Sequence, residues 1–191
     1  VAGTADYTGL EAVTNFEIKK ADSTISFNEG VSIGKEYNGE AVEITADDVT
    51  KTGSTNDVDF SWQQKEDDDW TDLTFAPVNA GSYRVIASVK EDRNFKGASA
   101  TIEFAISQTT NEWTSELSIE DWTYGQKAST PTATAQYGDV TFTYSDKKDG
   151  TYTDTVPTDA GTWYVKASVA GNENYTGLDA VNKFNIGKAN S

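Results

Sequence analysis

The sequence contains no cysteine, no histidine and no methionine. Without cysteine the chain cannot be held by disulfides, and without histidine or cysteine the common pairs of nucleophile and base cannot be assembled. Paired carboxylates are still available for glycoside hydrolysis. Among 31 acidic residues, however, some pair meets almost any distance rule, so such a pair carries little information. We therefore predict no catalytic residues, no cofactor and no enzymatic activity.

Long apolar runs and a leader peptide are also missing. No stretch approaches the roughly 20 apolar residues of a membrane-spanning helix, and the first residues show no signal-peptide pattern. The absence of methionine suggests a segment of a longer protein. If that protein is exported, we expect its targeting and anchoring segments to lie outside this chain.

Basic residues are scarce relative to acidic ones, 15 against 31, which gives a formal net charge of −16. Such a surface repels nucleic acid and anionic lipid, so we exclude both as partners. Strong negative charge is also common in disordered chains. Here 5 tryptophans, 9 tyrosines and 8 phenylalanines recur at regular intervals, which indicates packed domains instead.

The sequence repeats itself at a constant offset. Residues 77–83 (PVNAGSY) return as residues 157–163 (PTDAGTW), and residues 1–23 match residues 169–191. A fixed order of motifs, with gaps only between them, indicates tandem domains. We therefore predict the C-terminal strands of a truncated repeat at 1–20, a first repeat at 21–107, a polar linker at 107–111 and a second repeat at 112–191.

Apolar and polar residues alternate within both repeats. Residues 83–89 place Tyr83, Val85, Ala87 and Val89 on one face of a predicted strand, and residues 163–169 repeat the pattern. Similar strands are predicted at 58–62, 102–106, 140–144 and 182–186. Asn182 breaks the apolar pattern, which predicts a later start for its strand. Only residues 46–49 suggest a helical turn. The predicted fold class is all-β: tandem immunoglobulin-like antiparallel β-sandwiches.

One loop precedes the last predicted strand of each repeat. It comprises residues 94–97 (NFKG) in the first repeat and residues 174–177 (NYTG) in the second. Because a polar turn has little other use for an aromatic residue, we expect Phe95 and Tyr175 to pack beneath their loops.

The order of these motifs resembles a known family. Tyr124-Gly125 is followed by an aromatic strand, then Pro-x-x-Ala-Gly-x-aromatic-x-Val-x-Ala, then Asn-aromatic-x-Gly and a closing Phe-x-Ile. This order resembles the bacterial immunoglobulin-like surface repeats of the MBG (YGX) type. The first repeat departs from it, with Tyr37-Asn38-Gly39 and extra residues between 40 and 57.

The resemblance implies a non-enzymatic stalk or spacer segment of a large, adhesin-like protein. It implies an extracellular location on the bacterial cell surface or cell wall, with neighbouring repeats of the same protein as partners.

Two of the five tryptophans, Trp113 and Trp122, have no clear counterpart in the first repeat. They follow the linker, so they are expected either to pack at the junction or to form an exposed aromatic platform. They are therefore the candidate ligand-binding residues. The alternative function that they favour is an immunoglobulin-like module that binds a glycan or a host surface protein.

The densest acidic run is residues 65–70 (KEDDDW). A calcium site needs several oxygens converging on one point, but the run does not match an EF-hand, and its counterpart at 146–150 contains two lysines. We predict a solvated hairpin tip and no metal site.

The N-terminal segment carries an alternating face that includes Phe16 and Ile18. Since a lone hairpin is marginal in water, we expect this tail to pair with a sheet edge, in this chain or in another molecule.

Overall fold

The computed structural model describes residues 2–190, so residues 1 and 191, which end two of the predicted ranges, lie outside it. Within the described residues the fold is all-β, as predicted. The single helical element there is one turn of 3-10 helix, Ala46–Asp48, where the sequence predicts a helical turn. The described chain forms two compact units. The first comprises residues 2–31, 44–61 and 85–102, and the second comprises residues 32–43, 62–84 and 103–190.

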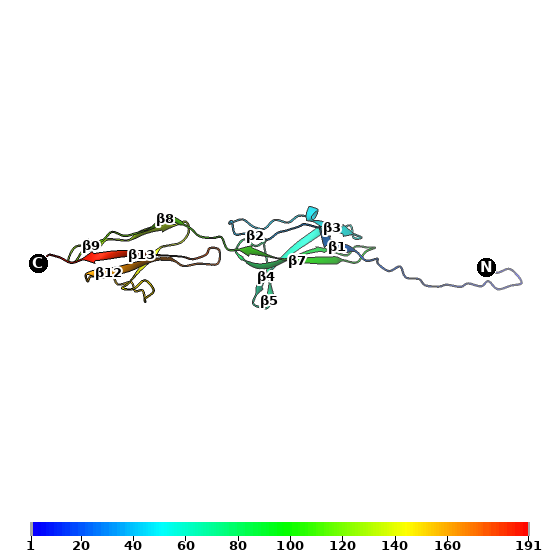
Figure 1. Ribbon diagram of the computed structural model, residues 1–191. Helices are drawn as coiled ribbons and strands as arrows, with labels where there is room; N and C mark the ends of the chain where they lie inside the picture. The colour runs from blue at the N-terminus through cyan, green and yellow to red at the C-terminus, as the bar shows by residue number, and fades with distance from the viewer. Residues whose placement is uncertain (1, 191) are drawn as a thin grey trace. The chain divides into compact units, whose positions relative to one another are not determined.

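The first repeat contains seven strands in two sheets. One sheet has the order β2-β7-β6-β4-β5 and the other pairs β1 with β3 (Figure 1). The strands are β1 (Thr24–Phe27), β2 (Lys35–Glu36), β3 (Val49–Thr52), β4 (Val58–Glu66), β5 (Asp69–Leu73), β6 (Gly81–Val89) and β7 (Ala98–Ser107).

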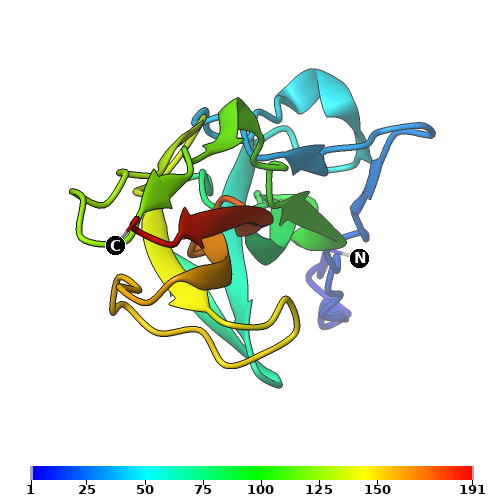
Figure 2. The same ribbon diagram turned by 60° about the vertical axis from the view of Figure 1, so that its left-hand side comes forward.

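The second repeat contains six strands, again in two sheets with the orders β11-β12-β13-β9 and β10-β8. In Figure 2 the yellow, orange and red strands β11, β12 and β13 follow one another across one layer. The strands are β8 (Trp113–Ser118), β9 (Trp122–Thr123), β10 (Thr132–Ala135), β11 (Thr141–Ser145), β12 (Gly161–Val169) and β13 (Leu178–Gly187).

Each repeat buries its core between its two sheets. In the second repeat, Phe184 and Ile186 of β13 pack with Val165 and Tyr144, and Leu117 of β8 covers them from the other sheet. In the first compact unit, Ile25 and Val49 of the small sheet pack against Ala87 of β6. The chain is therefore built of immunoglobulin-like antiparallel sandwiches, as the sequence predicts.

The alternation pattern locates the buried faces correctly. Val85, Ala87, Val165 and Ala167 are each 0% exposed. The predicted late start of the last strand is wrong, because β13 begins at Leu178 and pairs with β12 along its full length. Asn182 is tolerated because the strand ladder uses only backbone groups, and its exposed amide donates a hydrogen bond to the Leu117 carbonyl at 3.3 Å.

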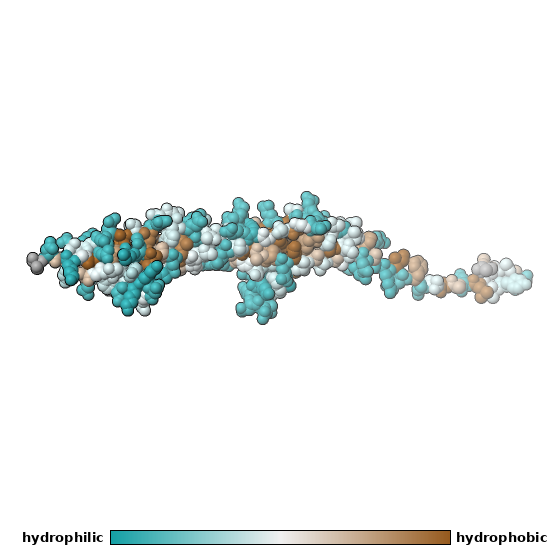
Figure 3. Space-filling model, in the orientation of Figure 1, coloured by the Kyte–Doolittle hydropathy of each residue, from teal (hydrophilic) through white to brown (hydrophobic). Residues whose placement is uncertain are grey.

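The N-terminal tail keeps a turn of the repeat but not its sheet. Thr4 and Tyr7 exchange backbone hydrogen bonds of 2.9 and 3.3 Å, while residues 8–20 belong to no strand. Phe16 is 84% exposed and Ile18 is 86% exposed, and apolar patches are visible along the tail in Figure 3. Pairing of this tail with a sheet edge stays a prediction.

Phe184 and Phe16 occupy equivalent positions of the repeat, so substituting each by alanine distinguishes the effect of burial from that of local sequence. Phe184 is 1% exposed, whereas Phe16, its equivalent in the tail, is 84% exposed. We expect Phe184→Ala to lower the free energy of unfolding by about 3–5 kcal/mol through the cavity that it leaves. Phe16→Ala is expected to change it by less than about 0.5 kcal/mol. Urea unfolding followed by circular dichroism checks both values, and equal losses would contradict the assignment of the core.

Candidate functional site

Trp122, the first candidate ligand residue, belongs largely to the core. It lies on β9, whose backbone runs parallel to β13, so its indole stacks on the Phe184 ring at 4.9 Å with an interplanar angle of 19°. The indole is half-buried, and its free edge helps to line a cavity of about 470 Å³ with Tyr124, Val156 and Pro157. Trp122 therefore supports the sandwich and offers only part of its surface to a ligand.

Trp113, the second candidate, lies at the start of β8 and is also half-buried. It lines a different hollow, of about 490 Å³, together with Glu116, Asp179 and Asn182. An aromatic side chain surrounded by carboxylates and an amide is a chemically reasonable site for a polar ligand. The structure thus places the two candidate tryptophans in separate cavities and does not bring them together.

The acidic run forms the tip of the β4–β5 hairpin, and Figure 3 shows this tip as a hydrophilic projection. Asp67 occupies the turn with φ of 53°. Trp70 lies behind the tip with the Arg84 guanidinium 4.4 Å from its ring centroid. Among the described residues, no group of three acidic side chains is arranged to hold a metal ion.

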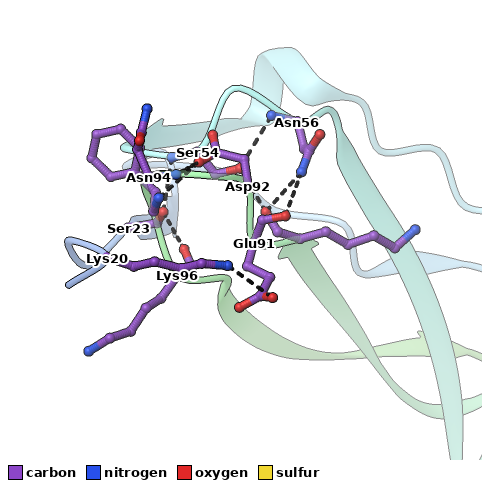
Figure 4. A network of polar contacts seen from close by, with 10 residues as sticks. Lys20, Ser23, Ser54, Asn56, Glu91, Asp92, Asn94 and Lys96 are labelled. Atoms are coloured by element: carbon purple, nitrogen blue, oxygen red, sulfur yellow. Dashed lines mark hydrogen bonds and ion pairs between the residues drawn. The ribbon is translucent and has the colours of Figure 1, made fainter. Parts of the chain in front are cut away.

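A network of polar contacts surrounds the loop before β7, and Asp92 lies within it (Figure 4). One carboxylate oxygen of Asp92 accepts the backbone N–H groups of Asn94 and Phe95, both at 2.8 Å. The other oxygen accepts the backbone N–H of Thr55 at 3.0 Å. These bonds, led by that from Thr55, lower the pKa of Asp92 from 3.8 to about 2. A single half-buried carboxylate thus fixes the turn and attaches it to a neighbouring loop.

The second repeat uses Asn172 for the same purpose. Its side-chain oxygen accepts the backbone N–H groups of Asn174 and Tyr175 at 2.8 and 2.9 Å. We call residues 92–97 and 172–177 the Asx loops. Alternation and repetition point to the aromatic residues of these loops but not to Asp92 and Asn172, although an Asx residue two positions before Asn94 and Asn174 is a usable signal.

Each Asx loop also holds the segment that enters its own repeat. Ala21 N donates to Asn94 O and Lys96 N donates to Ala21 O, both at 2.8 Å. In the second repeat Thr109 makes the equivalent pair of bonds, at 2.9 Å to Asn174 O and at 3.1 Å from Thr176 N. The predicted linker is therefore attached to the repeat that follows it by two backbone hydrogen bonds.

Tyr175, the aromatic residue of the second Asx loop, is half-buried against other tyrosines, and the packing of Phe95 and Tyr175 beneath their own loops stays a prediction. The Tyr175 ring stacks on Tyr137 with a centroid distance of 3.8 Å and an interplanar angle of 20°. Asn111, which is 3% exposed, closes the linker by donating from Nδ2 to the Tyr137 carbonyl at 2.8 Å. The side chains of Tyr175, Tyr137 and Asn111 thus hold the linker and the Asx loop in place. None of them is arranged to act on a substrate.

Comparison with known proteins agrees with this architecture. The model of the MBG domain family matches the chain twice, at residues 30–110 and 115–190. Among curated proteins, none matches the sequence at a significant level. No helix in the described part of the chain is long and apolar enough to cross a membrane.

Two solved structures show a distant likeness. A crystal structure of Drosophila N-cadherin EC1-3 is 6% identical with a TM-score of 0.30, over 90% of this chain and 69% of that chain. A structure of Sidekick-1 immunoglobulin domains 1–5 is 10% identical with a TM-score of 0.27, over 87% of this chain and 41% of that chain.

The lowered pKa of Asp92 makes a prediction about acid stability. Because the pKa in the folded state lies below the unfolded value of 3.8, the ionised carboxylate stabilises the fold above about pH 4. That contribution is lost as the pH falls towards about 2. Asn172 shows that an amide can hold the turn, so Asp92→Asn should fold but lose less stability over this range than the wild type. Thermal unfolding from pH 5 to pH 2 measures the difference, and parallel curves would contradict it.

Proposed function

Because the chain belongs to the MBG domain family, we propose that it is a non-enzymatic stalk segment of a large bacterial cell-surface protein. The segment is extracellular and contributes reach: it holds a distal binding region away from the cell surface or cell wall. Neighbouring repeats of the same protein are its principal partners.

The observation that supports this function most directly is the use made of the linker. Thr109 is hydrogen-bonded in both directions to the Asx loop of the second repeat, and Asn111 is buried beside Tyr137. A spacer needs connections that stay ordered when the chain is extended, and backbone hydrogen bonds plus burial supply that order. A flexible Gly/Ser-rich tether would instead leave this segment solvated.

The chemistry of the side chains also favours a non-catalytic role. The sequence has no histidine or cysteine to act as a base or a nucleophile. Among residues 2–190, the carboxylate with the most strongly lowered pKa is that of Asp92, and both its oxygens accept backbone N–H groups of its own fold. Its perturbed pKa is therefore explained by structure and needs no reaction.

The hollow beside Trp113 is the observation that favours a second function, binding of a glycan or a host surface protein. The indole and the polar groups of Glu116, Asp179 and Asn182 line it together. An aromatic face flanked by carboxylate and amide groups suits a sugar, whose apolar face stacks while its hydroxyls form hydrogen bonds. Trp122 lines a different cavity and is the weaker candidate, because its indole is stacked on Phe184.

The exposed tail adds a proposal about assembly. The Phe16 and Ile18 side chains are exposed and lie outside every strand of the described chain, so we propose that they pair with a sheet edge of another molecule. Gel filtration of the wild type beside the Phe16→Ala variant should then show a loss of association in the variant. A wild type that is already monomeric at high concentration would contradict the pairing.

A glycan array with the full chain tests the stalk against the binding module. A stalk should bind no glycan class above background, and Trp113→Ala should leave the array unchanged. Specific binding that Trp113→Ala abolishes would overturn the stalk in favour of a lectin-like module. Trp122→Phe is the matched control, because it keeps an aromatic ring on Phe184 and so preserves the fold, whereas Trp122→Ala would remove core packing.

A further inference from the structure

The Asx loop of the second repeat contacts the end of the first repeat, and all the residues involved lie in the second compact unit. Ala80 N donates to Asn174 Oδ1 at 2.9 Å, and Asn174 Nδ2 donates to Asn79 Oδ1 at 3.2 Å. The Tyr37 and Tyr175 rings meet edge to face at 5.4 Å. One asparagine amide thus uses both its acceptor and its donor. We call Tyr37 with residues 77–80 the receiving end of the first repeat.

The second repeat has an equivalent receiving end, made of Tyr124 with residues 157–160. Tyr124 N donates to Gly187 O at 2.8 Å, just as Tyr37 N donates to Ser107 O at 2.8 Å. After each tyrosine the chain turns at a glycine with positive φ, 80° at Gly39 and 83° at Gly125. The backbone bond that holds the tyrosine is therefore the same in both repeats, although the glycine stands two residues after Tyr37 and one residue after Tyr124.

The loop of the receiving end is also held in the same way in both repeats. Tyr83 OH donates to the Asn79 carbonyl at 2.9 Å, and Trp163 Nε1 donates to the Asp159 carbonyl at 3.0 Å. Each aromatic residue reaches back across the Ala-Gly turn to fix the carbonyl that precedes it. The second receiving end is thus preformed and does not need a partner to adopt this shape.

The two ends differ in exposure. Ala80, which donates to Asn174, is 8% exposed, whereas its equivalent Ala160 is exposed to solvent. Tyr37 is half-buried against Tyr175, whereas Tyr124 is 51% exposed. The difference falls on the positions that the Asx loop touches in the first repeat.

The exposed end is also hollow and apolar. Its cavity of about 470 Å³ is lined by Trp122, Tyr124, Ala128, Val156 and Pro157, among others. Val156 is 41% exposed, although it directly precedes the buried Pro157. Exposed apolar surface beside a loop with an exposed backbone N–H, here that of Ala160, is typical of a contact surface.

We propose that the receiving end of the second repeat binds the Asx loop of a further MBG repeat that continues the same polypeptide after Gly187. The Ala160 N–H donates to the side-chain oxygen of the loop asparagine, as Ala80 does to Asn174. The asparagine Nδ2 donates to the Asp159 carboxylate, which stands where Asn79 stands in the first repeat. The aromatic residue of the loop packs its edge on Tyr124, as Tyr175 does on Tyr37.

Two features of this chain indicate that the occupant is a loop of this type. Both Asx loops carry an asparagine followed by an aromatic residue, Asn94-Phe95 and Asn174-Tyr175, so the recognised pair is already present in each repeat. In addition, the linker residue Thr109 donates from Oγ1 to the Tyr37 carbonyl, so a following linker is itself part of the contact. After the second repeat the equivalent position is Ala189, which has no hydroxyl for that bond. Residues 188–190 (KAN) nevertheless repeat residues 20–22 (KAD), which lead into the first repeat, and this match favours a covalently continuous repeat over a separate molecule.

The test compares the present chain with a chain in which a second copy of residues 108–190 follows Gly187. The new linker then follows β13 as residues 108–111 follow β7. Amide hydrogen exchange measured by NMR reports on Ala160 in both chains, and Ala80 is the internal reference, since its partner Asn174 is present in each. We expect Ala160 to exchange at least about tenfold more slowly in the longer chain.

Substitution of asparagine supplies the control. Replacing the appended copy of Asn174 with alanine should restore fast exchange at Ala160 and leave Ala80 protected. Asn174→Ala at the original position should release Ala80 and leave Ala160 unchanged. Preserved chemical shifts in the cores of all chains show that each repeat still folds.

Equal exchange at Ala160 in both chains would overturn the proposal, and so would slow exchange that survives the alanine substitution. Protection of Ala160 that depends on concentration in the shorter chain would also overturn it, because it would assign the site to a separate molecule. The proposal rests on the stalk function and names its contact. The docking proposal and the stalk function can fail separately. Absence of docking would leave a stalk whose repeats are joined only by the linker. Specific glycan binding would overturn the stalk function and leave the docking result intact.

Discussion

Most of this structure depends on a side-chain oxygen that organises one loop. Asp92 in the first repeat and Asn172 in the second accept two successive backbone N–H groups and so fix the Asx loop. The fixed loop then pairs, through its own backbone, with Ala21 or Thr109 at the entrance to the repeat. The loop therefore sets where the last strand begins and where the chain enters, and the connection between repeats follows from it.

The tail keeps the turn found in the second repeat but not the strand that follows it there. The tail retains the turn at Thr4 and Tyr7, since that turn needs only local hydrogen bonds. The segment that follows the turn resembles β13 in sequence but lacks the neighbours β12 and β9, so it forms no strand, and Phe16 is exposed where Phe184 is buried. Local geometry is thus carried by a few residues, whereas burial of the last strand requires the rest of the sandwich.

The sequence was sufficient to predict the fold class because alternation places Val85 and Val165 on buried faces, and repetition shows that the pattern is not accidental. The prediction that the strand containing Asn182 starts late was wrong. An apolar pattern indicates which side chains are buried, but it does not report the backbone hydrogen bonds that extend β13. The sequence could not separate Trp113 from Trp122, since stacking on Phe184 depends on the parallel pairing of β9 with β13. The contact of Asn174 with Ala80 was also out of reach, because it joins residues far apart in the chain.

The central claim is that the linker at residues 107–111 is an ordered part of the structure, held by the Asx loop. Backbone ¹⁵N relaxation of the full chain tests this most directly. The hydrogen bonds of Thr109 and the burial of Asn111 predict order parameters near the value of about 0.85 that is typical of rigid strands. Values below about 0.6 at Thr109 and Asn111, with rigid strands on either side, would show a flexible tether and contradict the claim.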